Sequence, residues 1–360
     1  MKTIVILSDG TWQGEDQKSN NAKTDHPSNV VFTKEKILDE HPDTKIKQCY
    51  YYDEGINGTN FFSKIYNGMT GNGLDQNILD CYKYLINNYE PGDQIYLFGY
   101  SRGAFTVRSL AGMIRKCGIL KKTFESKTND VWNLYRSGDK PNFRIPSEFR
   151  KSFSIDGEVD TEIKFIGVWD TVGSLGIPYL RSNNFTTKKY EFHDHELNKS
   201  VKNAFHAIAI DETRKLFTPT LWDFIPKKGQ KVEQRWFVGV HANIGGGISD
   251  RELSDISLEW MLSKAKEVGL GLDNFSDTLS SNHLGKIAHA HFLFSLFDKK
   301  EPRVIGFTFD EHTKSDIIDK NQTLDPSVTL RFQNDPNYRP TNLIEYISKF
   351  ALLKSDFHQF

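Results

Sequence analysis

Ser101 is the residue whose surroundings most clearly indicate chemistry. It is the centre of Gly99-Tyr100-Ser101-Arg102-Gly103, which follows the glycine-x-serine-x-glycine pattern. In that pattern the two glycines allow a sharp strand-to-helix turn that holds the serine hydroxyl above a sheet. Such a hydroxyl is typical of a nucleophile that attacks an acyl group. The alternative is a plain glycine turn with an incidental serine.

A serine hydroxyl needs a base to take its proton and an acid to orient that base. When the serine occupies such a turn, the other two residues follow it in the order aspartate or glutamate, then histidine. Asp170 and His241 fit this order, and each comes shortly after a predicted strand. The alternatives are that Asp170 caps the turn after it and that His241 is a packed loop histidine.

Other acidic and histidine side chains are weaker candidates for these roles. Asp194 and Asp211 are rivals for the acid, but neither directly follows a predicted strand. His206 is the rival base, and its predicted helical setting favours a hydrogen-bonded histidine that supports the site from below. His193 and His195 have no further ligands nearby, so we expect a solvated loop there and neither a catalytic metal nor another cofactor.

An acyl-transfer site also needs hydrogen-bond donors for the negative oxygen that develops on the substrate. The backbone N–H of Arg102, directly after the serine, is the first expected donor. The second is expected from Gly10 or Thr11, in the turn that ends the first predicted strand. Asp9 is expected to support this turn or the Ser101 turn. The alternative is an ordinary strand-ending turn.

The elements that position these residues follow from apolar runs and their periodicity. Short apolar runs predict strands at residues 4–7, 49–52, 95–98, 165–169 and 236–240. Helices are predicted after Asn29 and over residues 78–89, 104–114, 201–208 and 258–268. This alternation predicts an α/β-hydrolase fold, with a mostly parallel central sheet, helices on both faces and inserted lid-like segments. Active-site residues gather at the carboxyl ends of parallel strands, which is where the candidates fall.

The domain organisation follows from where this pattern is strong. We predict a single α/β-hydrolase domain over residues 1–360. The pattern weakens over residues 121–160, which predicts an insertion or a lid. Residues 270–360 are less regular, and we expect them to form a C-terminal extension that packs on the core.

Composition excludes several classes of protein. The 46 Lys and Arg residues balance 47 Asp and Glu residues, so no net charge favours binding to nucleic acid. Three cysteines without a paired or metal-binding pattern are typical of free thiols in a reducing compartment. The apolar run 4–7 is too short for a signal peptide, and no stretch approaches the roughly 18 apolar residues of a membrane span. We expect a soluble protein made in the cytoplasm, with export by a route without a cleavable signal left open.

Together these residues resemble the uncharacterised α/β-hydrolase domain family that includes the type VI secretion lipase effectors of family 1. The shared blocks are Asp9-Gly10-Thr11-Trp12, Gly99 to Ala104, Gly167 to Ser174, His206-Ala207 with Asp211-Glu212-x-Arg214, Trp236 to His241, Gly245-Gly246-Gly247 and Tyr338 to Leu343. The resemblance implies a Ser-Asp-His triad, carried here by Ser101, Asp170 and His241, and no cofactor.

The resemblance also implies a substrate and partners. The effectors are phospholipases that cleave acyl esters of glycerophospholipids, which implies peripheral membrane contact. If this chain is an effector, a secretion apparatus and an immunity protein are implied partners. The family usually has Ser-Asp-Val after its histidine, where this chain has Ala242-Asn243-Ile244. Asn243 retains a side chain that can hydrogen-bond in support of the histidine loop, without the charge of an aspartate.

The sequence therefore predicts a serine hydrolase that cleaves the carboxylic ester of a lipid or phospholipid through an acyl-enzyme intermediate. An acyltransferase, a thioesterase or a peptidase would use the same three residues, and the sequence does not separate these reactions. A non-catalytic binding module with a hydrolase fold is a further alternative. The presence of all three residues argues against that alternative.

Overall fold

The computed structural model of the chain describes residues 1–10, 26–55, 72–172, 197, 199–222, 227–288, 300–310 and 315–353. Several residues considered above lie outside these ranges: Thr11, His193, Asp194 and His195. The other candidate site residues lie within them.

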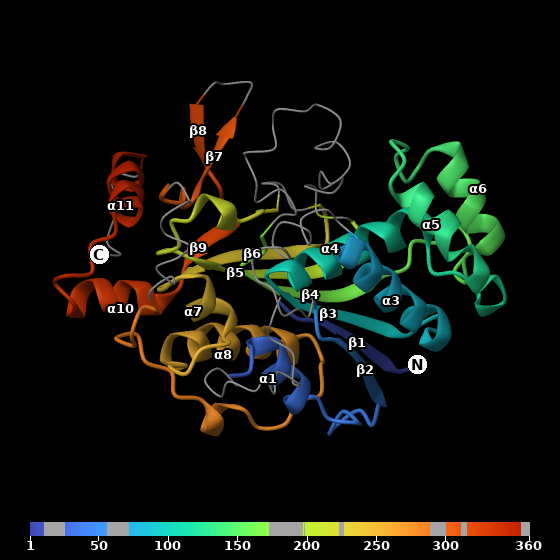
Figure 1. Cartoon of the computed structure of the whole chain (residues 1–360), viewed down its shortest axis with the longest axis horizontal. Coiled ribbons are helices and arrows are strands. Elements are labelled where there is room, and N and C mark those ends of the chain that lie inside the picture. Colours follow the sequence, from blue (N-terminus) through green and yellow to red (C-terminus); the bar gives the residue numbers. More distant parts are fainter. Residues whose placement is uncertain are drawn as a thin grey trace.

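A seven-stranded sheet forms the centre of the structure (Figure 1). Its strands are β1 (Thr3–Ser8), β2 (Gln48–Asp53), β3 (Gln94–Tyr100), β4 (Ile163–Trp169), β5 (Val201–Ala209), β6 (Lys231–Phe237) and β9 (Gln322–Leu324). They lie in the order β2-β1-β3-β4-β5-β6-β9, and every neighbouring pair is parallel. The predicted α/β-hydrolase fold with a mostly parallel sheet is confirmed.

Helices cover both faces of this sheet (Figure 1). They are α1 (Asn29–Lys36), α3 (Asn72–Asn88), α4 (Arg102–Cys117), α7 (His241–Gly245) and α8 (Glu252–Glu267). Ile4 and Ile6 of β1 belong to the core formed with α3 and α4, whereas Val5 and Leu7 belong to the core formed with α1, α7 and α8. Successive side chains of a strand point to opposite faces, so each central strand contributes to both cores.

The segment predicted as a helix at residues 201–208 is strand β5 instead. It lies between β4 and β6, and residues 204–209 are all buried. The apolar residues Val201, Ala204, Phe205 and Ile208 have the spacing of one face of a helix, so the pattern alone favoured a helix. Hydrogen bonding to a parallel strand on each side makes it a strand here. His206 therefore belongs to the central sheet.

Residues 121–160 form a small helical unit beside the C-terminal end of α4 (Figure 1). The unit contains η1 (Lys122–Lys127), α5 (Thr128–Tyr135) and α6 (Arg144–Phe153). Lys116, near the C-terminal end of α4, donates to the carbonyl oxygens of Tyr135 and Ser137. Helix α4 begins directly after Ser101, and its 16 residues span about 24 Å. The segment thus follows the end of α4 that is farther from Ser101, and the prediction that it is an insertion or a lid stays a prediction.

The C-terminal region adds a strand to the sheet and several outer elements. These are η5 (Ser276–Thr278), the antiparallel pair β7 (Phe307–Asp310) and β8 (Ser315–Ile318), α10 (Pro326–Asn334) and α11 (Thr341–Leu353), while η4 (Lys215–Phe217) precedes β6. Strand β9 pairs with β6 at one edge of the sheet. Val328 and Leu343 pack with Trp236 of β6 in a third core cluster. Within the described ranges, no helix is both long and apolar enough to span a membrane.

Candidate active site

The register of the sheet places Ser101 beside Asp170. Tyr100, the last residue of β3, pairs with Trp169, the last residue of β4. The Ser101 N–H donates to the Trp169 carbonyl oxygen at 3.0 Å. Ser101 and Asp170 therefore each follow the carboxyl end of one of two neighbouring parallel strands. This is the edge of the sheet at which α/β proteins carry their ligand sites.

Ser101 lies in a strained turn between β3 and α4. Its φ is 56° and its ψ is −116°, and a positive φ costs energy in a residue with a side chain. The flanking glycines permit this turn to pack closely. A Cβ at Gly99 would lie 2.5 Å from the carbonyl oxygen of Gly103, and a Cβ at Gly103 would overlap the carbonyl oxygen of Ser8. The sequence pattern thus has a steric cause at both glycines.

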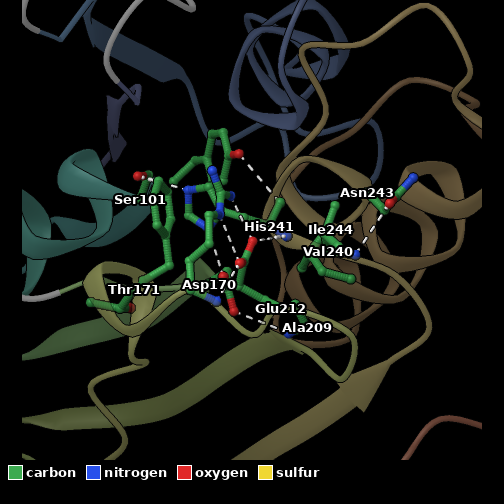
Figure 2. A network of polar contacts seen from close by, with 12 residues as sticks. Ser101, Asp170, Thr171, Ala209, Glu212, Val240, His241, Asn243 and Ile244 are labelled. Atoms are coloured by element: carbon green, nitrogen blue, oxygen red, sulfur yellow. Dashed lines mark hydrogen bonds and ion pairs between the residues drawn. The ribbon is translucent and has the colours of Figure 1, made fainter. Parts of the chain in front are cut away.

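His241 lies between Ser101 and Asp170 (Figure 2). Its Nε2 is 2.9 Å from Ser101 Oγ, and its Nδ1 is 2.6 Å from Asp170 Oδ2. An ionised carboxylate only accepts hydrogen bonds, so Nδ1 carries the proton and Nε2 accepts from the Ser101 hydroxyl. The three residues singled out from the sequence thus form one hydrogen-bonded chain.

Packing around the imidazole of His241 holds its orientation. The rings of Tyr100 and Phe217 lie 4.8 and 4.9 Å from it between centroids, and Phe217 meets it edge-on. Gly245 leaves room for Tyr100, because a Cβ there would overlap the tyrosine ring. The Tyr100 hydroxyl also donates to the His241 carbonyl oxygen at 3.3 Å. Two rings and one hydrogen bond therefore restrict the base.

Glu212 holds the backbone of the same histidine (Figure 2). Its Oε2 accepts the His241 N–H at 3.3 Å, and its carboxylate accepts from Arg214 Nε and Nη2 at 2.8 and 2.6 Å. Burial acts to raise the pKa of Glu212, but hydrogen bonds and charge from Arg214 outweigh it and lower that pKa. Glu212 is therefore an anion that anchors the first residue of α7. The sequence showed it only as part of a shared block.

Asp170 is fully buried and is bound on both oxygens by Arg303. Arg303 Nη1 donates to Oδ1 at 2.6 Å, Arg303 Nη2 donates to Oδ2 at 2.9 Å, and the Ala209 N–H donates to Oδ1 at 3.0 Å. Burial acts to raise the pKa of the Asp170 carboxyl, but the Arg303 charge and the hydrogen bonds from His241 and Arg303 hold it well below its usual range. Sequence analysis missed Arg303, because a long-range ion pair leaves no local pattern.

Asp211, the described rival for the acid, has a different task. Its Oδ2 accepts the Gly239 N–H at 2.6 Å and the Tyr338 hydroxyl at 3.1 Å. Burial raises the pKa of Asp211 to about 6, although these hydrogen bonds lower it. Asp211 therefore fastens the loop before His241 to the C-terminal region.

His206, the rival base, lies beneath the turn that follows Asp170. Its Nε2 accepts the Thr171 N–H at 3.0 Å. Burial and the nearby charge of Arg108 lower the pKa of His206 to about 3, so its imidazole is neutral at physiological pH. The hydrogen bond fits the supporting role expected from the sequence, although the residue reaches it from a strand.

The two expected oxyanion donors differ in the structure. Arg102 is the first residue of α4, where backbone N–H groups have no partner within the helix. Gly10 lies close to the nucleophile, since a Cβ there would be 3.4 Å from Ser101 Cβ. However, the Gly10 N–H donates to Asp9 Oδ1 at 2.6 Å, which corrects the expectation of an open donor at this atom. Thr11, the other candidate, lies outside the described residues.

Asp9 ties the β1 turn to two other segments. Its Oδ2 accepts from the Ser28 hydroxyl at 2.6 Å and from the Tyr52 hydroxyl at 2.9 Å. Burial raises the pKa of the Asp9 carboxyl to about 7, although hydrogen bonds from Ser28, Gly10 and Tyr52 lower it. Asp9 thus holds the turn that packs beside Ser101.

Asn243 braces the loop of the base with both ends of its amide. Its Oδ1 accepts the N–H groups of Val240 and Ala288 at 3.2 and 3.0 Å, the former visible in Figure 2. Its Nδ2 donates to the Lys286 carbonyl oxygen at 3.1 Å, a bond that an ionised aspartate could not make. This explains how asparagine serves at a position where the resembling family usually has aspartate.

The described side chains contain no cluster of three or more His, Cys, Asp or Glu residues that could hold a metal ion.

Comparison with known proteins places these residues in a family. The model described as type VI secretion system phospholipase effector, Tle1-like, catalytic domain, matches residues 2–264. The chain belongs to this family. Ser101, Asp170 and His241 all lie within the matched range, whereas Arg303 lies beyond it. Membership assigns the Tle1-like chain to a family of lipase-type hydrolases.

The Tle1-like chain is also similar to a curated protein and to solved structures. It is 33% identical over 251 residues to the uncharacterized protein YEL023C of Saccharomyces cerevisiae (strain ATCC 204508 / S288c). That alignment covers 63% of this chain but only 34% of the yeast protein, so the chain spans about a third of that relative's length.

Two solved structures are matched at low similarity. The Tle1 effector bound to the VgrG spike from the type 6 secretion system has a TM-score of 0.42 at 16% identity, covering 86% of this chain and 82% of that one. An uncharacterized protein from Pseudomonas aeruginosa has the same TM-score and identity, covering 76% of this chain and 46% of that one.

Proposed function

We propose that the Tle1-like chain is a serine esterase that cleaves the acyl ester of a phospholipid through a covalent acyl-enzyme. The observation that carries the proposal is the 2.9 Å contact between Ser101 Oγ and His241 Nε2. The 2.6 Å contact between His241 Nδ1 and Asp170 supports it, because it orients the base. Membership in a family of phospholipase effectors supports the phospholipid as substrate class.

The first half-reaction transfers the acyl group to Ser101. His241 Nε2 takes the hydroxyl proton while Oγ forms a bond to the ester carbonyl carbon, and Asp170 stabilises the imidazolium. The tetrahedral intermediate then breaks its bond to the alcohol oxygen. The alcohol leaves with the proton from His241 Nε2, and the acyl group stays on Ser101 Oγ.

The second half-reaction uses water in place of the alcohol. His241 takes a proton from the water as its oxygen attacks the acyl carbon, then returns the proton to Ser101 Oγ as the free acid leaves. In both halves the negative oxygen is stabilised by the Arg102 N–H and the N-terminal end of α4. The second donor is expected from the Gly10 N–H, which must then exchange Asp9 Oδ1 for the substrate oxygen.

The Arg102 side chain favours a substrate that carries a phosphate. Burial lowers the pKa of its guanidinium to about 10, so it remains a cation at neutral pH. In the described part of the chain, it makes no hydrogen bond or ion pair. A partly buried cation beside the nucleophile is costly unless a ligand binds it, and a guanidinium matches a phosphate group in geometry and charge.

A serine-directed fluorophosphonate probe tests the nucleophile. It should label the wild-type chain and leave Ser101→Ala unlabelled. Ser109→Ala, which removes another serine of α4, is the matched control and should be labelled like wild type. Loss of Ser101 or His241 alone should lower ester hydrolysis by roughly 10⁴-fold or more, because such residues act as a unit. Labelling of Ser101→Ala at the wild-type rate would exclude the proposal.

The substrate class is tested with two lipids that differ only in the phosphate headgroup. We expect hydrolysis of phosphatidylcholine vesicles to exceed that of diacylglycerol with the same acyl chains. Arg102→Gln keeps the backbone N–H and should lower kcat/KM for the phospholipid about 10- to 100-fold, the value of a charged hydrogen bond. Its hydrolysis of a nitrophenyl ester should stay near that of wild type. An equal loss on all three substrates would contradict phosphate recognition by Arg102.

A further inference from the structure

Arg303 is bound to the centre of the site although it belongs to the C-terminal region. Its guanidinium donates to both oxygens of Asp170 and also to the carbonyl oxygens of Ala209 and Phe217. Both charged side chains are buried, Arg303 at 6% exposure and Asp170 at 0%. The family match ends at residue 264, so this contact comes from outside the recognised catalytic domain.

Two side chains, those of Arg303 and His241, share the Asp170 carboxylate in a fixed geometry. The fork of Arg303 lies in line with both oxygens, while His241 Nδ1 approaches Oδ2 alone. A planar, bidentate pair fixes the plane of the carboxylate, which a single point charge would not do. The plane in turn determines where Oδ2 meets the imidazole.

We propose that Arg303 is a positioning residue of the Ser101–His241–Asp170 site, which keeps Asp170 ionised and in plane and extends activity to lower pH. The inference rests on the proposed function of these three residues. Without Arg303, and with a neutral imidazole at His241, the Asp170 carboxylate would be a buried anion with no counter-charge. Such a carboxylate takes up a proton.

The other ionisable groups around the pair do not replace this charge. Those that face Asp170 and His241 are Tyr100 from β3, His206 from β5, Glu212 and Arg214 from the segment after β5, and Arg303. Burial raises the pKa of Tyr100 far above its ordinary value, so its hydroxyl is neutral. His206 is also neutral, and Glu212 and Arg214 form an ion pair. Arg303 is thus the cation in direct contact with Asp170.

Removing Arg303 should shift the pH dependence in one direction. Without the cation, the Asp170 carboxyl takes up a proton at higher pH and no longer accepts from His241. This change moves the acidic limb of the pH profile upward, because an opposite charge at this distance shifts the pKa of a carboxyl by about one to three pH units.

The test measures the rate of fluorophosphonate labelling of Ser101 against pH in the full chain. We expect Arg303→Met to move the acidic limb up by at least about one pH unit. Arg303→Lys keeps the positive charge but loses the bidentate geometry. Its acidic limb should lie between those of wild type and Arg303→Met. The matched control is Arg331→Met, which removes another buried arginine of the C-terminal region that donates to backbone carbonyls of His283 and Gly285. That control should keep the wild-type limb even if it loses stability.

A double variant keeps the test decisive if Arg303→Met folds poorly. In an Asp170→Asn background, adding Arg303→Met should change the labelling rate little, because residues that act through one another are not additive. An unchanged acidic limb in both Arg303 variants, or full additivity with Asp170→Asn, would overturn the inference. Absence of labelling in wild type, or labelling of Ser101→Ala, would instead reject the proposed function itself.

Discussion

Arg303 Nη1 and Asp170 Oδ1 lie 2.6 Å apart although 133 positions separate the two residues in the chain. The contact joins the C-terminal region to the carboxyl end of β4, directly behind His241. Strand β9, next to β6, and the hydrogen bond from Tyr338 to Asp211 tie the same region to the sheet. The region that follows the matched catalytic domain thus contributes both to the sheet and to the electrostatics of the site.

Asp170→Asn should strongly reduce the rate of acylation. Asparagine would present an amide to the imidazole and allow the wrong tautomer of His241, a change that lowers kcat by roughly 10⁴-fold in serine proteases. Steady-state hydrolysis of a nitrophenyl ester measures the loss. Asp211→Asn is the control, because Asp211 binds Gly239 and Tyr338. It should cost less than about ten-fold, and equal losses in both variants would argue against Asp170 as the partner of the base.

Gly103→Ala should destabilise the fold, because the added methyl group would overlap the Ser8 carbonyl oxygen of β1. We expect the free energy of unfolding to fall by about 3 kcal/mol or more. Gly138→Ala is the matched control, since a Cβ there meets nothing within 4 Å and should change stability by less than about 0.5 kcal/mol. Urea denaturation of the two variants decides the matter. Similar midpoints would show that β1 can move away from the Ser101 turn.

Asp9→Asn should change stability in a pH-dependent way. Burial raises the pKa of Asp9 from 3.8 to about 7, so between these values the folded chain keeps a proton that the unfolded chain loses. The stability that Asp9 contributes is therefore fully present below about pH 4 and is lost as pH rises to about 7. Asparagine carries no such proton. The variant should gain stability relative to wild type by up to about 1.4 kcal/mol per pH unit across this window.

Urea denaturation at steps of about half a pH unit, from about pH 5 to about pH 8, measures this difference in the free energy of unfolding. The range covers the upper part of the window. The other titrating groups are common to both proteins, so they cancel in the comparison. Asp43→Asn, at an exposed position, serves as the control and should show no such trend. A constant difference between Asp9→Asn and wild type would mean that Asp9 is already ionised throughout.

Much of the site could be predicted from the sequence because its parts are local. The turn around Ser101 needs a strand before it, a helix after it and a glycine on each side, and these features are adjacent in the chain. Asp170 and His241 follow buried apolar runs that form parallel strands. Since parallel strands end at one edge of the sheet, their order along the chain was enough to predict that the three residues meet.

The errors concern features that depend on neighbours distant in the sequence. The run at residues 201–208 has apolar residues at helical spacing, and only its pairing with β4 and β6 makes it a strand. The Gly10 N–H was expected to be open, but the fold turns the Asp9 carboxylate toward it.

By itself, the sequence determined the alternating strands and helices around Ser101 and the order of Ser101, Asp170 and His241, because glycine sterics and apolar periodicity act over a few neighbouring residues. Only the tertiary structure decided which charge stabilises Asp170. A buried anion requires a counter-charge, but any arginine that the fold can bring within hydrogen-bond distance satisfies that requirement. The choice of Arg303 therefore comes from the packing of the C-terminal region against the sheet, and no local pattern records it.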